Sequence, residues 1–340
     1  MAPVLITGVA GFIGHHTAIR YLRQGVSVVG VDIADFGGES PVRPFAAIQQ
    51  SSALASSLHR LRSARFAHVQ AELQKARASG ADVNFEFVHA DVSDNDAVLP
   101  IFERHKPSLV VHLAARAGVR ASIEEPHAFA RCNLVGFVNM LDACVKHGVD
   151  HFVYASSSSV YGNRAGPCAE SMPVNLPVSP YAATKAANEL LAHSYAACHK
   201  LNTTGLRFFT VYGPYGRPDM ALWIFADAIL SGRPIPLFNN GEMVRDFTYV
   251  DDVVDAVVAA GNALRPNERG LYRILNVGGG TPVPVRRFVD ALQSALKVTA
   301  TIKQLPMQVR CQFSICCIGL VDVTSQKRLR LCVPGQQRRS

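Results

Sequence analysis

Tyr181 and Lys185 lie four residues apart in a stretch with helical periodicity, so both side chains project from one helix face. A phenol with an ordinary pKa near 10 is a poor base at neutral pH. An ammonium group beside it favours the phenolate, which can remove a proton from an alcohol. The pair is common by chance, so it needs support from the rest of the chain.

A run of hydroxyl groups precedes this pair. Residues 152–155 are apolar and lead directly into Ser156, Ser157, Ser158 and Ser159. A strand at 152–155 would deliver these hydroxyls to the carboxyl edge of a sheet, where open α/β sheets bind ligands. A hydroxyl, a tyrosine and a lysine can together take a proton from an alcohol while a cofactor takes the hydride from the same carbon.

A glycine-rich turn supplies a place for that cofactor. The turn separates an apolar run at 4–6 from a periodic stretch ending near Gln24. Gly8 allows a tight turn, Gly11 lets the backbone approach a pyrophosphate, and Gly14 lets the helix pack against the strand. The candidate contacts are Gly8, Gly11, Phe12, Ile13 and Gly14.

Asp32 completes a dinucleotide-binding pattern. It follows the apolar run 26–31 and lies some 24 residues beyond Gly8. A Rossmann unit places there the acid that binds the adenosine ribose diol. A carboxylate repels a 2′-phosphate and no arginine follows directly, so the sequence favours NAD over NADP.

Composition limits the class of protein. The chain has 340 residues, of which 49% are hydrophobic and 18% charged, enough for a large core. No stretch approaches the roughly 20 apolar residues of a membrane helix. Because the N-terminus enters a strand at once, without the pattern of a signal peptide, we expect a cytoplasmic protein with no membrane association.

The net charge of +8 is concentrated at the C-terminus. Residues 309–340 carry six basic side chains and one acid, which leaves only +3 for the preceding residues. A small anionic substrate explains that remainder, and a nucleic-acid partner is not expected. The cysteines form no C-x-x-C pair or Cys/His cluster, so we also expect no metal.

Strand and helix patterns alternate along most of the chain, which predicts an α/β fold with a Rossmann-type doubly wound parallel sheet. The expected strands are 3–7, 26–31, 84–88, 108–112, 150–155 and 203–208. The expected helices are 13–24, 94–104, 127–147, 180–200, 219–231, 251–264 and 285–296.

The alternation is interrupted by residues 36–83. Apolar residues there recur at helical spacing with basic residues between them, which favours an amphipathic helix or hairpin packed on the sheet over a partner-binding segment.

A smaller mixed α/β lobe follows. We expect residues 1–205 to form the NAD-binding domain, with 246–276 packing back onto it. We expect 206–245 and 277–308 to form the substrate-binding lobe.

Together these features resemble the extended short-chain dehydrogenases/reductases that act on nucleotide sugars, and among them the UDP-glucuronate 4-epimerases. The resemblance covers residues 3 to about 307, except for 36–83. The segments that carry it are Gly8–Gly14, Asp91–Val92, His112–Pro126, Tyr154–Gly162, Tyr181–Lys185, Arg207–Pro218 and Arg245–Val254.

The resemblance assigns roles position by position. It implies that Ser157 hydrogen-bonds the sugar O4, that Tyr181 is the base, and that Lys185 activates Tyr181 and contacts a ribose. Four further residues would contact NAD: Asp91 and Val92 at the adenine, and Ala114 and Ala115 at the pyrophosphate. The UDP-sugar would contact Arg245 through its diphosphate, and also Asn133 and Asn276.

The carboxylate of a glucuronate is the chemical difficulty. Oxidation at C4 gives a β-keto acid, which loses CO₂ readily unless the carboxylate is held out of line with the ketone. The resemblance points to Ser158, Ser159, Thr210 and Arg217 as the retaining contacts, although a surface salt bridge is the alternative for Arg217. Dehydratases carry an acid pair at the positions of Ser158 and Ser159, so elimination of water is disfavoured.

Three positions or segments depart from the family pattern. Arg116 replaces a usual glutamine, and Ala121 a usual tyrosine. Residues 309–340 replace a Pro-Gly-Asp turn and a helical finish, which favours a shifted reading frame or altered splicing over a genuine cysteine-rich tail. If so, part of the uridine pocket is missing, and UDP-sugar binding should be weak.

Other functions therefore stay open: a UDP-galactose 4-epimerase, a UDP-glucuronate decarboxylase, or a non-catalytic NAD-binding regulator. A homodimer through the helices at 127–147 and 180–200 is expected by analogy alone.

Overall fold

The computed structural model describes residues 2–34, 52–164, 166–265, 267–306 and 314–317. Its central layer is a seven-stranded parallel sheet with the order β11-β7-β5-β4-β1-β2-β3. The strands are β1 (Val4–Thr7), β2 (Val28–Asp32), β3 (Phe85–His89), β4 (Leu109–His112), β5 (His151–Ser157), β7 (Asn202–Phe208) and β11 (Tyr272–Val277). The order reverses between β1 and β4, and open parallel sheets bind ligands at such a point.

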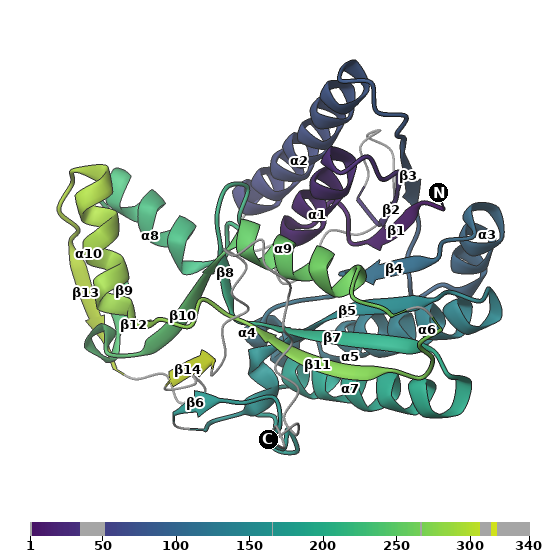
Figure 1. The fold of residues 1–340 in the computed structure, drawn as a ribbon. Coiled ribbons are helices and arrows are strands. Elements are labelled where there is room, and N and C mark those ends of the chain that lie inside the picture. Colours follow the sequence, from purple (N-terminus) through teal and green to yellow (C-terminus); the bar gives the residue numbers. More distant parts are fainter. Residues whose placement is uncertain (1, 35–51, 165, 266, 307–313, 318–340) are drawn as a thin grey trace, which may run out of the picture.

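Helices cover both faces of this sheet (Figure 1). On one face are α1 (Phe12–Arg23), α2 (Ser52–Ala78) and α9 (Val250–Gly261), which share one apolar core with the strands. On the other are α3 (Asn95–His105), α6 (Gly136–Lys146) and α7 (Pro180–His199), which share a second core. Strands buried on both faces tend to read as apolar runs, and the sequence predicted six of these seven strands. It did not predict β11 as a strand, although it expected the segment 246–276 to pack onto this domain. The predicted Rossmann-type fold is confirmed.

The predicted helix at 127–147 is present as one helical segment at 126–146, which consists of three parts. These are α5 (Pro126–Ala130), the π-helical turn η2 (Arg131–Val135) and α6. The apolar spacing of this segment predicted a helix but not the π-helical turn within it.

Smaller elements lie beyond the carboxyl edge of the sheet. One unit joins α8 (Ala221–Leu230) and α10 (Val285–Leu296) to the parallel pair β9 (Ile235–Phe238) and β13 (Ile302–Leu305) around an apolar core. A five-stranded sheet connects this unit to the larger layer (Figure 1). Its strands are β6 (Pro167–Cys168), β8 (Thr210–Tyr212), β10 (Val244–Tyr249), β12 (Pro282–Pro284) and β14 (Ser314–Cys317). The remaining elements are α4 (Val119–Glu124), η3 (Ser158–Tyr161) and η4 (Asn239–Gly241).

The interruption at 36–83 contains one long helix, α2, rather than a hairpin among its described residues. Val69, Leu73 and Ala76 bury their side chains in the core shared with α1, as expected for an amphipathic helix. Residues 35–51 lie outside the described part of the chain. So does most of the atypical tail, although the backbone of β14 pairs in parallel with β10 and β6.

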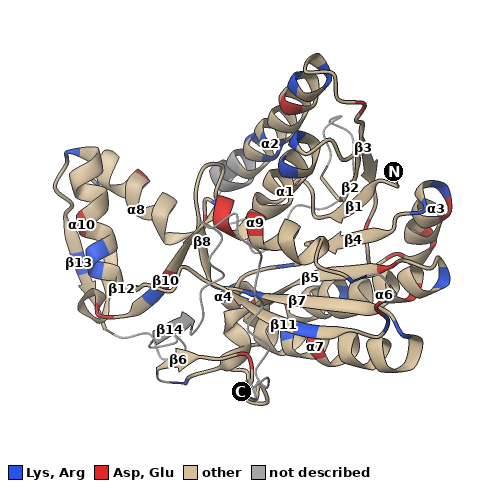
Figure 2. Ribbon diagram, in the orientation of Figure 1, with Lys and Arg blue, Asp and Glu red and all other residues tan. Residues whose placement is uncertain are grey.

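Figure 2 shows charged positions on many of the helices, including basic ones on α1 and α2 and acidic ones at the start of α9. From the sequence we expected no stretch long and apolar enough to cross a membrane, but among the described residues segment 126–146 meets that criterion, with a mean hydropathy of 1.3. Core helices satisfy the same criterion, and α6 buries Phe137, Met140 and Leu141 against the sheet. This segment is therefore weak evidence for a membrane span.

Candidate active site

The glycine turn between β1 and α1 tolerates no larger side chain. A Cβ on Gly8, whose φ is +71°, would lie 2.7 Å from the backbone nitrogen of Ala114. A Cβ on Gly14 would lie 2.1 Å from the carbonyl oxygen of Gly8, and one on Gly11 2.8 Å from the same oxygen. No side chain caps the amino end of α1, which Phe12 and Ile13 begin. Its first N–H groups can therefore bind an anion.

Asp32 lies at the end of β2 and contacts this turn. Its carboxylate accepts hydrogen bonds from the backbone N–H of Ala10 (2.9 Å) and of Ala34 (3.0 Å). Burial raises the pKa of Asp32, while the positive charge of Arg62 and the backbone hydrogen bonds oppose the rise. The acid and the glycine turn are thus brought together, as the spacing predicted.

The other cofactor candidates follow the neighbouring strands. Asp91 comes just after β3, and its carboxylate accepts hydrogen bonds from the N–H and the hydroxyl of Ser93, both 2.8 Å long. Val92 is buried beside it. Ala114 follows β4, where its N–H donates to the hydroxyl of Thr7 (3.1 Å), and Ala115 comes next. Because β1 to β4 are parallel and adjacent, these residues share one edge of the sheet.

Ser157 and Tyr181 meet at the end of β5. The strand ends at Ser157, whose hydroxyl accepts a hydrogen bond from the N–H of Ser159 (3.2 Å). The phenol of Tyr181, in the first turn of α7, lies near enough to the same hydroxyl for Ser157 to lower its pKa. Burial raises the pKa of Tyr181, while Ser157 and the positive charge of Arg217 lower it. The predicted hydroxyl–phenol pair is present.

Lys185 lies one turn further along α7 and is buried, with 3% of its surface exposed. Its Nζ donates a hydrogen bond to the carbonyl oxygen of Ala155 (2.8 Å). Burial lowers the pKa of Lys185 to about 8, and nearby Cys132 opposes that shift. The sequence predicted that this ammonium activates Tyr181, but the groups that lower the pKa of Tyr181 here are Ser157 and Arg217.

Sequence reasoning missed a buried network behind the serine turn. Glu189 and Arg207 form a two-pronged ion pair of 2.9 and 2.7 Å. Glu189 also accepts a hydrogen bond from Ser156 (2.6 Å), and Arg207 donates one to the phenol of Tyr161 (2.8 Å). A signal did exist, because Glu189 follows Lys185 by one helical turn and Arg207 stands between Leu206 and Phe208 in an expected strand. The network fixes both ends of the segment that carries Ser157.

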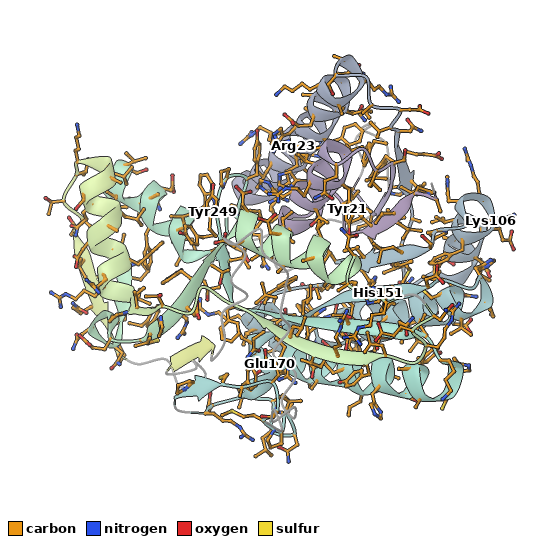
Figure 3. All side chains as sticks on the ribbon, viewed as in Figure 1. Tyr21, Arg23, Lys106, His151, Glu170 and Tyr249 are labelled. Atoms are coloured by element: carbon orange, nitrogen blue, oxygen red, sulfur yellow. The ribbon has the colours of Figure 1, made fainter. Side chains whose placement is uncertain are left out.

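Asn133 and Asn276 use their side chains inside the protein. The amide of Asn133 bonds the backbone of Arg116 and the hydroxyl of Thr184. Asn276 donates to the carbonyl of Cys168 (2.9 Å) and accepts from Tyr161 (2.7 Å). Its backbone N–H donates to the carboxylate of Glu170, which Figure 3 labels near β6. Substrate contacts by these asparagines stay predictions.

The remaining substrate candidates come from three places. Ser158 and Ser159 form η3, directly after Ser157. Thr210 begins β8, which pairs with β10, the strand that carries Arg245. The side chain of Arg245 donates a hydrogen bond to the carbonyl of Val244 (2.8 Å).

Arg217 has two attachments. It forms an ion pair with Asp219 (2.5 Å) and donates a hydrogen bond to the carbonyl oxygen of Ala117 (3.3 Å). The salt bridge stated as its alternative is therefore present. The positive charge of the same guanidinium also lowers the pKa of Tyr181.

Comparison with known proteins identifies the family. A sequence model of the NAD dependent epimerase/dehydratase family matches residues 4–278. The chain belongs to this family. A nicotinamide dinucleotide is therefore its cofactor, and the glycine cradle and the open amino end of α1 fit the pyrophosphate of such a group.

Relatives within the family have specific names. A probable UDP-glucuronate 4-epimerase of Rhizobium meliloti is 40% identical over 319 residues, covering 89% of this chain and 85% of the relative. A Bacillus cereus UDP-glucuronic acid 4-epimerase, solved with UDP-glucuronic acid and NAD, matches with a TM-score of 0.75 and 29% identity, covering 93% of this chain and 90% of that one. The UDP-glucose 4-epimerase of Thermus thermophilus, solved with NAD, matches with a TM-score of 0.72 and 28% identity, covering 93% and 90%.

No group of three or more His, Cys, Asp or Glu side chains that could hold a metal occurs among the described residues of this epimerase-family chain. Three imidazoles do lie close together beside the glycine turn, from His15 and His16 of α1 and His68 of α2. Sequence reasoning missed them because His68 is more than fifty residues away along the chain. It also missed Arg65 of α2, which is buried against the same turn.

Proposed function

We propose that this chain is an NAD-dependent UDP-sugar 4-epimerase that interconverts UDP-glucuronate and UDP-galacturonate through a transient 4-keto intermediate. The observation that carries the proposal is the placement of Ser157 at the end of β5 and of Tyr181 in the first turn of α7, near enough that Ser157 and the charge of Arg217 both lower the pKa of the phenol. An alcohol bound there would meet a base and a cation together.

The cofactor would be held by backbone rather than by charge. The residues proposed to hold NAD are Gly8, Gly11, Phe12, Ile13, Gly14, Asp32, Asp91, Val92, Ala114, Ala115, Tyr181 and Lys185. NAD held by these residues would supply a reversible hydride acceptor for the sugar C4, which inversion at that carbon requires. The carboxylate of Asp32, fixed by Ala10 and Ala34, suits the ribose diol.

Tyr181 would remove the proton from the sugar O4 while Ser157 keeps that oxygen in place. Because burial raises the pKa of Tyr181, its phenolate needs nearby positive charge. Arg217 supplies part of it. Lys185, whose pKa is lowered to about 8, can exchange a proton near neutral pH.

The fate of the uronate carboxylate distinguishes this epimerisation from the decarboxylation of UDP-glucuronate. In the 4-keto intermediate the C5–C6 bond can break, so that CO₂ leaves and the electron pair forms an enolate that is protonated at C5. Hydroxyls of Ser158, Ser159 and Thr210 and the guanidinium of Arg217 would prevent this by turning the carboxylate. Arg245, Asn133 and Asn276 are proposed as contacts to the remainder of the UDP-sugar.

The same proposal gives roles to the parts of the fold. Residues 1–205, with 246–276, would form the NAD-binding domain, and 206–245 with 277–308 the substrate lobe. The pairing of β11 with β7 and the packing of α9 on α1 support this division. A cytoplasmic location, a homodimer, and the absence of nucleic-acid and membrane partners are part of the proposal.

Incubation of the purified chain with UDP-glucuronate, followed by NMR of the products, tests the function. UDP-galacturonate supports the proposal. Released CO₂ with a UDP-pentose would instead identify a decarboxylase. Turnover of UDP-glucose alone would identify a neutral-sugar epimerase, which the resemblance to the Thermus thermophilus enzyme makes the second candidate. Bound NAD without any turnover would favour a non-catalytic regulator.

A further inference from the structure

A helix outside the resemblance reaches both ends of the proposed site. Arg65 of α2 is buried, with 3% of its surface exposed. Its Nη1 donates to the carbonyl oxygen of Ala10 in the glycine turn (3.0 Å). Its Nε and Nη2 both donate to the carbonyl oxygen of Tyr215, at 3.1 and 2.7 Å. One guanidinium therefore ties the cofactor turn to the segment that follows β8.

That segment is held by two further contacts. The ring of His68, one turn after Arg65 on α2, stacks on Tyr215 with 5.1 Å between centroids. The Nε2 of His16 on α1 donates to the carbonyl oxygen of Pro214 (3.0 Å). Tyr215 has a φ of +59°, which a tyrosine adopts only where surrounding contacts impose it.

Arg217 follows Tyr215 by two residues. Arg65 responds to charges from both ends of the site: the negative charge of Asp32 raises its pKa, and the positive charge of Arg217 lowers it. Movement of the Tyr215 carbonyl would therefore move the guanidinium proposed to hold the uronate carboxylate.

We propose that Arg65 is a positioning residue, which fixes segment 213–217 against the glycine turn so that Arg217 keeps the uronate carboxylate out of line with the C4 ketone. This role rests on the proposed function. It also gives a role to α2: we call the hydrogen bonds of Arg65 to the carbonyl oxygens of Ala10 and Tyr215 the clamp. Without the clamp, the C5–C6 bond of the 4-keto intermediate would break more often, so that CO₂ leaves and the enolate is protonated at C5. Where the resulting UDP-4-ketopentose leaves before the hydride returns to C4, reduced nicotinamide would accumulate.

The test compares Arg65→Met with Arg65→Lys and with Arg77→Met. Arg77 is the matched control, because it also lies on α2 and donates to a carbonyl, that of Val83 (3.0 Å), away from the site. Lysine can reach one carbonyl but lacks the planar fork needed for both. A ratio of UDP-galacturonate to CO₂ is measured for each variant, together with the accumulation of reduced nicotinamide.

We expect Arg65→Met to raise the fraction of turnovers that end in CO₂ by roughly tenfold or more, because a charged hydrogen bond of this kind is worth about that factor. Arg65→Lys should fall between Arg65→Met and wild type, and Arg77→Met should match wild type. An unchanged ratio in folded Arg65→Met, with melting temperature and bound NAD as checks, overturns the proposal. If Arg65→Met does not fold, the ratio of UDP-galacturonate to CO₂ is measured in Arg65→Lys instead, and an unchanged ratio there overturns the proposal.

Hydrogen exchange separates this inference from the proposed function. The N–H groups of Gly216 and Met220 are bonded to Gly213 and Arg217, so their exchange reports on the clamped segment without any substrate. We expect about tenfold faster exchange there in Arg65→Met but not in Arg77→Met. Unchanged exchange would refute the clamp. If the wild-type protein fails to convert UDP-glucuronate, the proposed function is refuted. The hydrogen-exchange measurement alone would then decide whether Arg65 fixes the segment 213–217.

Discussion

The cofactor end and the sugar end of the proposed site are built in opposite ways. At the cofactor end, Gly8 and Gly14 present backbone at distances that leave no room for a Cβ. At the sugar end, Ser157 and Tyr181 present side chains, supported from behind by the Glu189–Arg207 ion pair. The first end recognises a ligand by shape, so substitution there should disrupt structure. The second acts through functional groups, so substitution there should remove chemistry and leave the fold intact.

The largest effect is expected at the glycine turn. Gly14→Ala places a Cβ 2.1 Å from the carbonyl of Gly8, so the turn must open. We expect loss of bound NAD and a fall in unfolding free energy of about 4 kcal/mol or more. Gly25→Ala is the control, because Gly25 has a φ of +77° but nothing within 4 Å. It should cost only about 1 kcal/mol and retain NAD. Equal losses in the two variants would contradict the shape argument.

The next effect concerns catalysis alone. Tyr181→Phe removes the proposed base, and we expect turnover of UDP-glucuronate to fall by roughly 10²–10⁴-fold with unchanged melting temperature and NAD content. Tyr195 lies on the same helix and faces Asp142 and Lys146 of α6. Tyr195→Phe should keep wild-type turnover. Full activity in Tyr181→Phe would remove the basis of the mechanism.

Acid should weaken the parallel-sheet half. Burial lowers the pKa of His15 to about 2, of His112 to about 3 and of His151 to about 4. As pH falls below about 6.5, the unfolded chain binds protons that these folded imidazoles do not, so stability decreases. At about pH 5 each of these three histidines should lower the free energy of unfolding by ~2 kcal/mol. Denaturant unfolding of wild type and His151→Phe at about pH 7 and pH 5 measures this. The variant should lose about 2 kcal/mol less on acidification, and an identical loss would contradict it.

The smallest effect concerns a family departure at the boundary between the two ends. Arg116 pairs with Glu125 (3.0 Å) and lies over the ring of Phe129, which in turn contacts Tyr181 edge-on. Arg116→Gln should cost about 1 kcal/mol or less and change KM for UDP-glucuronate by less than about tenfold. The exposed pair of Arg269 and Asp150 gives the control, since Arg269→Gln should change neither stability nor KM. A large fall in kcat for Arg116→Gln would place this arginine in the chemistry.

The two ends also differed in how far the sequence predicted them. The turn at Gly8–Gly14, the acid at Asp32 and the alternating strands all follow from local spacing, and the structure contains them. The α2 insertion was expected as a helix or hairpin, but its contact with the site was not. Arg65 could not be connected to Tyr215 from the sequence, because 150 residues separate them. Glu189 and Arg207 carried a readable signal, an acid and a base in apolar surroundings, but not their pairing.

By itself, the sequence determined the parallel sheet, the glycine turn and the residue types that can move a proton, because strand burial, backbone freedom and helical spacing are local properties. Tertiary structure alone decided which distant groups meet: Glu189 with Arg207, and Arg65 with the carbonyl oxygens of Ala10 and Tyr215. These contacts depend on how distant helices and strands pack, since an ion pair or a hydrogen bond forms only where the fold brings donor and acceptor within about 3 Å.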